Sequence, residues 1–276
     1  MRTRSMLFGP ANRVDFVPKF VAAGADIGVL DLEDAVAESG KQAARDALVD
    51  NAPGAGELGT MRLFVRVNAI DSSHFTEDMA AAAEAGAVGV VVPKLEDGPG
   101  VNHVRSAMTE LGIGQLCAGI ESAAGVDRAT EIARERIDLL YFGAEDFITD
   151  MGGVRTEGND EVLYARSKVA LAARLGQVPA LDQVVVDYND GARFEQEAAV
   201  ARSLGYSGKL CIHPNQVALA NAAFTPTEEE LAWAHGVLAA AEAAEAVGTG
   251  VISYEGVMVD APILVRARAL IDRATD

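Results

Sequence analysis

The chain of 276 residues has the size of one β/α barrel, which typically takes about 250 residues. Half of its residues are hydrophobic and only 5% are aromatic, which favours aliphatic strands and alanine-rich helices over a β-sandwich. The formal net charge of −18 argues against nucleic acid and anionic membranes as partners, since both need a basic face. A small anionic ligand is compatible with this charge if local cations bind it.

Both cysteines, Cys117 and Cys211, lie in apolar runs, and we expect them to be buried small side chains rather than a disulfide or a nucleophile. The amino terminus lacks the long apolar stretch of a signal peptide. No segment approaches the roughly 18 apolar residues that are needed to span a bilayer. We therefore predict a cytoplasmic protein.

In chain order, short β-like runs alternate with longer helical patterns. The candidate strands are residues 5–9, 26–34, 61–68, 88–94, 115–121, 137–143, 180–188 and 208–214. The helical patterns between them include residues 14–24, 39–51, 72–86, 160–176 and 191–205. These helical patterns include stretches that stop at Gly24, Gly86, Gly176 and Gly205. Glycine closes a helix in the left-handed conformation at little energetic cost.

Strands that alternate with helices predict parallel βαβ units, and eight such units favour a closed (β/α)8 TIM barrel of the α/β class. An open doubly wound sheet is the alternative architecture. It normally carries a G-x-G-x-x-G phosphate loop directly after an early strand, and no such loop follows an early strand here. The closed barrel is therefore our prediction.

The alternation ends after about residue 225. Residues 225–248 have the pattern of one amphipathic helix, and Thr227 followed by Glu230 forms a capping box at its start. A short extended turn and a last helix, VRARALIDRA, follow. We predict a barrel domain over residues 1–225 and a C-terminal helical extension over residues 226–276, which serves as a lid, an oligomer contact or simple packing.

Polar residues follow the aliphatic strand runs at the point where each run ends. They are Glu33, Asp34, Arg66, Asn68, Lys94, Glu121, Glu145, Asp146, Asp187 and His213. In a β/α barrel the carboxyl ends of the strands meet at one mouth, where the active site forms. We therefore expect these side chains to converge there.

Several carboxylates at one mouth repel each other unless a cation balances them. A divalent cation could provide this balance, and ligation by oxygen atoms alone favours Mg²⁺ or Mn²⁺ over zinc. Glu121 and Asp146 follow adjacent strands and are the predicted direct ligands. Glu33 and Asp34 are predicted to hold metal-bound waters.

Each of these residues also has a purely structural interpretation. Glu121 and Asp146 suit the first turn or the N-cap of a helix, and Glu33 with Asp34 suits a solvated turn. Arg66 and Lys94 suit structural ion pairs. His213 fits a hydrogen-bonded loop residue better than a base or a ligand. The sequence alone leaves these interpretations open.

The motifs resemble the citrate lyase β-subunit-like (CitE-like) proteins of the HpcH/HpaI aldolase superfamily. The resemblance runs from residue 4 to about residue 265. It rests on the segments RSMLFGPANR, VLDLEDAVAESGKQAAR, VRVNAID, VVPKLED, GIESAAGV, FGAEDFITDMGG, LYARSKV, VVVDYNDGARFEQEA, GKLCIHPNQ and YEGVMVDAPIL. Together and in this order they are specific to the superfamily but not to one substrate.

The resemblance implies a β/α barrel that is usually a homotrimer, with a C-terminal extension that reaches a neighbouring subunit. It assigns metal binding to Glu121 and Asp146, substrate contact to Arg66, and a water-mediated acidic pair to Glu33 and Asp34. It also implies that Asp260 acts as an acid or base across the trimer interface, with a cap before the last helix as its structural alternative. Arg4, Arg13 and Lys19 are implied as coenzyme A contacts by approximate position only.

The resemblance therefore implies a Mg²⁺-dependent carbon–carbon lyase. The predicted reaction is reversible Claisen-type cleavage of a carboxylated 3-hydroxyacyl-CoA, of the malyl-CoA or citramalyl-CoA class, to an acyl-CoA and a 2-oxo acid. Three alternatives stay open at this point. They are a citrate lyase β-subunit that acts on an acyl carrier protein, a CoA-independent 2-oxo acid aldolase, and a non-catalytic binding protein on the same fold.

Overall fold

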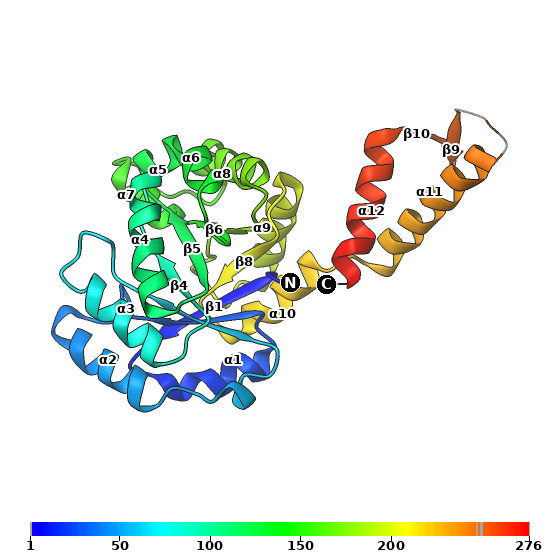
Figure 1. Cartoon of the computed structure of the whole chain (residues 1–276). Helices are drawn as coiled ribbons and strands as arrows, with labels where there is room; N and C mark the ends of the chain where they lie inside the picture. The colour runs from blue at the N-terminus through cyan, green and yellow to red at the C-terminus, as the bar shows by residue number, and fades with distance from the viewer. Residues whose placement is uncertain (1, 247, 249–250, 276) are drawn as a thin grey trace. The chain divides into compact units, whose positions relative to one another are not determined.

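A computed structural model describes residues 2–246, 248 and 251–275 of the chain. Two compact units are present, one spanning Thr3–Ala222 and a second that begins at Ala223 and also includes Arg2. The first unit is the barrel, and the second holds the C-terminal helices (Figure 1). The domain limits predicted from the sequence, with a change at residue 225, stay a prediction.

Eight parallel strands form a closed barrel in sequential order, with β8 paired to β1. The strands are β1 Ser5–Pro10, β2 Ile27–Asp31, β3 Arg62–Arg66, β4 Gly89–Val92, β5 Gln115–Ile120, β6 Leu139–Phe142, β7 Ala180–Asp182 and β8 Gly208–Cys211. Each predicted run coincides with one strand, and only β1 extends beyond its run, by one residue, so the predicted TIM barrel is confirmed. Most of the strands end earlier than predicted, because their last polar residues belong to the loops of the mouth.

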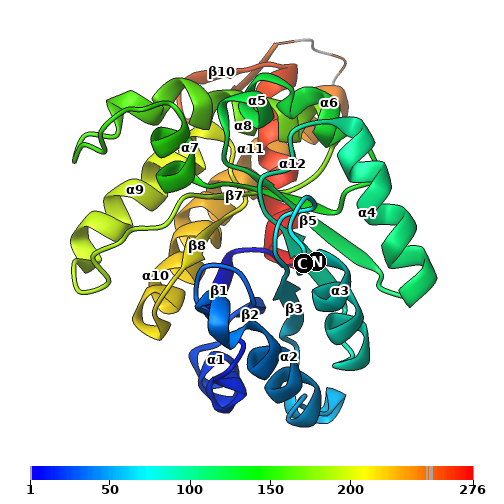
Figure 2. The same cartoon turned by 90° about the vertical axis from the view of Figure 1, so that its left-hand side faces the viewer.

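Helices surround the strands on the outside of the barrel (Figure 2). They are α1 Val17–Ala23, α2 Lys41–Asp50, α3 Phe75–Glu84, α4 Gly98–Leu111, α5 Ala123–Asp127, α6 Ala129–Arg134, α7 Ala144–Asp150, α8 Leu163–Gly176, α9 Gly191–Leu204 and α10 Pro214–Phe224. Short 3-10 turns occur at Val14–Phe16, Glu38–Gly40, Ala55–Glu57 and Asp160–Val162. Five predicted helical patterns between strands therefore correspond to helices.

Three of the four glycines predicted to close helices do so in the left-handed region, with φ of +74° at Gly24, +70° at Gly86 and +100° at Gly205. The helix before the fourth glycine, α8, also stops at Gly176 as predicted, but Gly176 itself is not left-handed. Gly176 is the last residue of α8, and Gln177 after it takes the left-handed conformation with φ of +57°. A methyl group at position 176 would overlap with the backbone carbonyl of Ala133 in α6, so this glycine permits close helix packing instead.

The interior of the barrel is filled by alternate residues of the strands, because successive side chains of a strand point to opposite faces. These buried residues are Met6, Ile27, Val29, Phe64, Val91, Cys117, Leu139, Tyr141, Leu181 and Leu210. Continuing the same alternation to the carboxyl ends of β2, β3 and β5 reaches Asp31, Arg66 and Glu121. The side chains that fill the barrel therefore lead directly into a polar mouth.

The second unit contains α11 Glu228–Ala246, α12 Ala261–Thr275 and an antiparallel hairpin of β9 Ile252–Tyr254 and β10 Val257–Val259. The predicted capping box is present, since Thr227 N donates to Glu230 Oε2 over 2.9 Å and Glu230 N donates to Thr227 Oγ1 over 3.1 Å. The segment predicted as a turn is this hairpin. The last helix begins at Ala261, four residues before the predicted pattern.

The two cysteines are free and buried, as predicted. Burial raises the pKa of the Cys211 thiol to about 12, so this thiol stays protonated at neutral pH and is a poor nucleophile. Within the part of the chain that the structure describes, none of the helices is both long enough and apolar enough to cross a membrane.

Candidate active site at the carboxyl end of the barrel

A pocket of about 460 Å³ lies at the carboxyl ends of the strands. It is lined by Phe8, Gly9, Pro10, Asp31, Asp34, Ala35, Arg66, Glu121, Tyr141, Gly143, Ala144, Glu145, Asp146, Val184, Leu210 and Ile212. One part of this lining is apolar, and the other holds carboxylates around one guanidinium. Such a pocket suits a small ligand with an apolar part and an anionic part.

Arg66 is held in place chiefly by two carboxylates, and a third, that of Asp34, lies 3.7 Å from its Nη2. Its Nε and Nη2 donate to the two oxygens of Asp31 over 2.8 and 2.6 Å, a bidentate pair. Its Nη1 lies 2.9 Å from Glu33 Oε2. Burial lowers the pKa of Arg66, but the hydrogen bonds and charge of Asp31 outweigh this and raise it well above its ordinary value. Arg66 is therefore a fixed positive charge in the pocket wall.

Glu121 is almost completely buried, with 3% of its surface exposed. Its Oε1 accepts from the backbone N–H of Lys94 over 2.9 Å and from the Tyr141 hydroxyl over 3.1 Å. Burial, followed by the charges of Glu33 and Asp146, raises the pKa of Glu121 to about 7. A cation next to this carboxylate would therefore relieve a real electrostatic cost.

Lys94 connects several strand ends. It has a φ of +52°, a left-handed conformation that is uncommon for a residue other than glycine. Its ammonium lies 3.0 Å from Glu33 Oε1 and 3.4 Å from Asp146 Oδ1. Burial lowers the pKa of Lys94, but the charge of Glu33 and the other carboxylates around it raise it by more. Lys94 therefore contacts three carboxylates, one through its backbone and two through its side chain.

The loop after β2 brings Glu33 to the mouth and is fixed from behind. Lys41 donates to the backbone carbonyls of Leu32 and Glu33, each over 2.7 Å, and to Asn68 Oδ1 over 2.9 Å. Burial raises the pKa of Glu33, although Arg66 counteracts the shift. Glu33 Oε2 is buried and forms no hydrogen bond with the described residues, so its contact there is the ion pair with Arg66 Nη1 at 2.9 Å. The predicted contact of Glu33 with metal-bound water stays a prediction.

Asp146 and Asp34 are the more exposed carboxylates of the pocket, with 39% and 62% of their side chains exposed. Asp146 lies in the first turn of α7. Glu145 beside it pairs with Arg155 over 2.8 Å, so its charge is already balanced. The two predicted metal ligands, Glu121 and Asp146, both line the pocket, and their binding of a divalent cation stays a prediction.

The donor set fits Mg²⁺. Among the described residues, no three His, Cys, Asp or Glu side chains converge as metal ligands. Mg²⁺ usually takes one or two protein carboxylates and keeps several waters, so a pair of carboxylates is sufficient. The carboxylate oxygens suit a hard cation and not zinc, which prefers nitrogen and sulfur.

Five predicted mouth residues are not part of the pocket lining. Glu33 and Lys94 contact lining residues through their ion pairs with Arg66 and Asp146, whereas the other three have partners elsewhere. Asn68 is buried behind β3, where it donates to Asp78 and to the backbone carbonyl of Leu32. Asp187 is exposed and accepts from the backbone N–H of Asn189 over 3.0 Å. His213 stacks on Tyr188 with ring centroids 4.7 Å apart. The structural interpretation of His213 as a loop residue therefore fits its surroundings.

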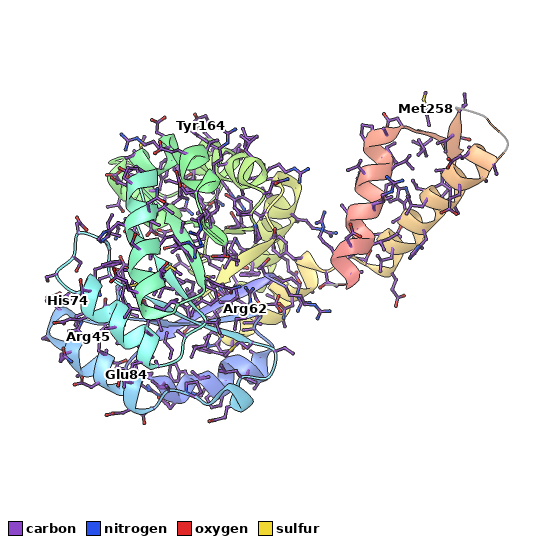
Figure 3. All side chains as sticks on the ribbon, in the orientation of Figure 1. Arg45, Arg62, His74, Glu84, Tyr164 and Met258 are labelled. Atoms are coloured by element: carbon purple, nitrogen blue, oxygen red, sulfur yellow. The ribbon has the colours of Figure 1, made fainter. Side chains whose placement is uncertain are left out.

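The three predicted coenzyme A contacts separate into two groups. Arg13 and Lys19 both lie over the ring of Phe16, at 4.1 and 4.4 Å from its centroid, in the segment after β1. Arg4 precedes β1 and pairs with Asp26 over 2.8 Å. Arg4 therefore lies at the amino end of the barrel, as does Arg62, the first residue of β3, which is labelled in Figure 3. The length of β1 therefore separates Arg4 from the other two, and its contact with coenzyme A stays a prediction.

Asp260 belongs to the second unit. It is exposed and precedes α12, where its Oδ1 accepts from the backbone N–H of Ile263 over 3.3 Å. This contact matches the structural alternative of a helix cap. One carboxylate oxygen is free of that contact, so a cap and an acid–base role are compatible.

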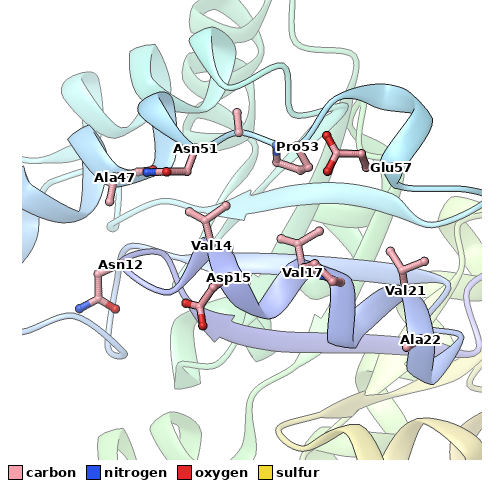
Figure 4. A pocket seen from close by; sticks show the side chains of 12 residues that line it. Asn12, Val14, Asp15, Val17, Val21, Ala22, Ala47, Asn51, Pro53 and Glu57 are labelled. Atoms are coloured by element: carbon pink, nitrogen blue, oxygen red, sulfur yellow. The ribbon is translucent and has the colours of Figure 1, made fainter.

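A second hollow, of about 720 Å³, lies beside α1 and the segment after α2 (Figure 4). Its walls include Val14, Val17 and Val21, and its polar residues include Asn51 and Glu57. Among the described residues that line it, none is a lysine or an arginine and none is a buried polar side chain. We therefore place the chemistry at the strand ends and not in this hollow.

The model of the HpcH/HpaI aldolase/citrate lyase family matches residues 4–214. The chain belongs to this family. A citrate lyase subunit beta-like protein of Deinococcus radiodurans is 48% identical, over 97% of this chain and 96% of that protein. The mitochondrial citramalyl-CoA lyase of Rattus norvegicus is 28% identical, over 99% of this chain and 86% of that protein.

A solved structure agrees with the family assignment. The CitE protein of Mycobacterium tuberculosis, crystallised with magnesium, acetoacetate and coenzyme A, is 35% identical and superimposes with a TM-score of 0.82. The alignment covers 99% of this chain and 98% of that one. The predicted resemblance and the predicted class of a metal-dependent lyase are therefore confirmed.

Two polar side chains of the pocket, those of Asp31 and Tyr141, were not among those predicted from the sequence. Asp31 continues the inward series of Ile27 and Val29, and Tyr141 follows Leu139 in the same way. The alternation of β2 and β6 could therefore have identified both. The contacts of Lys94 could not be found in this way, because they depend on a positive φ.

Proposed function

We propose that the protein is a Mg²⁺-dependent lyase that cleaves a carboxylated 3-hydroxyacyl-CoA, of the malyl-CoA or citramalyl-CoA class, to an acyl-CoA and a 2-oxo acid. The observation that carries the proposal is the pocket in which Arg66 lies next to the buried Glu121 and to Asp146. The rat relative named as a citramalyl-CoA lyase and the CitE structure with magnesium and coenzyme A support it.

Glu121 and Asp146 would hold the metal, with Glu33 and Asp34 binding its waters. When bound, Mg²⁺ supplies Lewis-acid polarisation of the substrate oxygen and promotes loss of the hydroxyl proton. The raised pKa of Glu121 supports this assignment, because the buried carboxylate lacks a full charge partner in the protein itself.

Arg66 would stabilise the negative oxygen of the substrate. In the reaction the hydroxyl loses its proton, the carbon–carbon bond breaks, and the electron pair moves into a thioester enolate. Asp31 and Glu33 hold the Arg66 guanidinium, so it needs little reorganisation as charge develops. Fixed hydrogen-bond donors of this kind accelerate a reaction by roughly 10²–10³-fold.

Asp260 is the proposed general acid that protonates the enolate carbon, and it would reach the pocket of a neighbouring subunit in a homotrimer. The proposal has a direct test by mixing subunits. Inactive Asp260→Ala chains and inactive Arg66→Ala chains should regain part of the activity when they assemble together. No regain in assembled mixtures would remove the shared site from the proposal.

Coenzyme A is proposed to contact Arg13 and Lys19. Their cationic groups flank the exposed segment after β1, and β1 itself ends at Gly9 and Pro10 in the pocket lining. A phosphate-bearing carrier bound there would direct its thioester towards the pocket. Replacing both cations by alanine should raise KM for the CoA thioester with a smaller effect on kcat.

The deciding experiment is a panel of CoA thioesters with glyoxylate or pyruvate as the partner acid, with and without Mg²⁺. We expect metal-dependent turnover that is abolished in Glu121→Gln and in Asp146→Asn while both variants stay folded. Full activity in both variants would refute the metal assignment.

The same panel separates the alternatives. Turnover of free CoA thioesters by the isolated chain argues against an obligatory acyl carrier protein, as a citrate lyase β-subunit would need. Cleavage of free 2-oxo acids without any binding of CoA would instead indicate a CoA-independent aldolase. Absence of turnover on every substrate would favour the non-catalytic alternative.

A further inference from the structure

The contacts of Glu121 are unequal on its two carboxylate oxygens. Oε1 accepts two hydrogen bonds, from the backbone of Lys94 and from the Tyr141 hydroxyl. No hydrogen bond to Oε2 is found among the described residues. One oxygen is therefore occupied by the protein, and the other is available to a ligand.

The space beside Oε2 depends on Gly143. A methyl group at that position would overlap with Oε2 of Glu121 and crowd its Cβ. Gly143 lines the pocket together with Glu121 and Tyr141, and the absence of a side chain at this position leaves the room that Oε2 occupies. Tyr141 in β6 and Gly143 directly after this strand lie two residues apart, and both adjoin the Glu121 carboxylate.

Tyr141 has no other polar partner among the described contacts, and its hydroxyl is buried inside the barrel. A buried tyrosine hydroxyl usually finds a hydrogen-bond partner. Here its partner is a predicted metal ligand and not a backbone group. The hydroxyl is therefore placed to orient that ligand, as groups behind metal ligands commonly do.

We infer that Tyr141 is a positioning residue that holds Oε1 of Glu121, so that Glu121 offers Mg²⁺ the single oxygen Oε2. This inference rests on the proposed function. It assigns to Tyr141 a role in metal choice as well as in metal affinity. A carboxylate fixed by one oxygen suits the octahedral geometry of Mg²⁺, whereas Ca²⁺ accepts bidentate carboxylates and more ligands.

The test is Tyr141→Phe, which removes one hydroxyl and keeps the ring. Calorimetric titration of the purified full chain with Mg²⁺ alone should show an affinity reduced by about 10–100-fold. Titration with Ca²⁺ alone should show a smaller reduction, because a released Glu121 can bind Ca²⁺ through both oxygens. The ratio of the Ca²⁺ to the Mg²⁺ dissociation constant should therefore fall.

Tyr206→Phe is the matched control. The Tyr206 hydroxyl is equally buried and donates to the backbone carbonyl of Arg166 over 2.7 Å. It does not line the pocket. Tyr206→Phe should lose about as much stability as Tyr141→Phe, but its affinities for Mg²⁺ and Ca²⁺ should equal those of the wild type. Gly143→Ala is a second, independent variant, and it should weaken Mg²⁺ binding by displacing Oε2.

Unchanged Mg²⁺ affinity in Tyr141→Phe, with wild-type binding that depends on Glu121, would overturn this inference alone. Equal losses in Tyr141→Phe and Tyr206→Phe would also overturn it, because they would show a general loss of stability. A wild-type chain that binds no Mg²⁺, or a Glu121→Gln variant that binds it normally, would overturn the proposed metal site together with the inference.

Discussion

The ion pair between Arg66 and Asp31 allows the structural and chemical roles of Arg66 to be separated. Arg66→Met removes the guanidinium while keeping an unbranched apolar side chain. Asp31, which is 2% exposed with Arg66 present, then keeps only the backbone N–H groups of Glu33 and Ala35 as donors. Removing one partner of a buried ion pair leaves the other charge unpaired in a medium of low dielectric constant.

We expect Arg66→Met to lower the free energy of unfolding by about 3–5 kcal/mol, the usual cost of such a break. For a unit of this size that corresponds to a fall in melting temperature on the order of 10 °C. The double variant Arg66→Met with Asp31→Asn has no stranded charge. It should recover most of the loss, with an interaction energy of about 2–3 kcal/mol in the double-mutant cycle.

The assay is urea unfolding of the wild type, both single variants and the double variant, monitored by circular dichroism in one buffer at neutral pH. Mg²⁺-dependent cleavage is measured on the same samples. Stability should return in the double variant while activity stays low, because Arg66 would still be absent from the pocket.

Two results would refute this reasoning. If Asp31→Asn fails to restore stability to Arg66→Met, the charge of Asp31 is not the cause of the loss. If the double variant regains normal cleavage, Arg66 serves only to balance Asp31, and its assignment to the substrate is wrong.

Three further predictions concern other parts of the chain. In the metal-free protein the pKa of Glu121 is raised from an ordinary value of 4.5 to about 7. The stabilisation from this shift is fully present below pH 4.5 and is lost as the pH rises through 7. The stability of Glu121→Gln relative to wild type, measured by urea titration, should therefore increase by about 3 kcal/mol between pH 4.5 and pH 8. Gly176→Ala should lower the free energy of unfolding by about 1–3 kcal/mol in thermal unfolding, because its methyl group would overlap with the carbonyl of Ala133. The control Gly114→Ala places a methyl group in ordinary van der Waals contact only, so it should lower the stability less. Thr227→Ala should destabilise the C-terminal unit by about 1 kcal/mol, and a melting temperature equal to that of wild type would contradict the capping box.

Much of the site could be predicted because two simple rules act together. Aliphatic runs identify strands, and parallel strands of a barrel bring their carboxyl ends to one mouth. These two rules were enough to place Arg66, Glu121 and Asp146 around one pocket. The same rules also predicted that Asn68 and Asp187 lie at the mouth, but neither lines the pocket. A residue that follows a strand can also turn away from the mouth.

The sequence by itself determined the eight strand runs, the cap at Thr227 and the family motifs, because these depend on residues within a few positions of each other. Only the tertiary structure decided which charges pair. Asp31 meets Arg66 because β2 and β3 are neighbours in register, and Arg4 is removed from the mouth by the length of β1. Barrel closure and the positive φ of Lys94 bring together groups that are distant in sequence, and no local pattern encodes those distances.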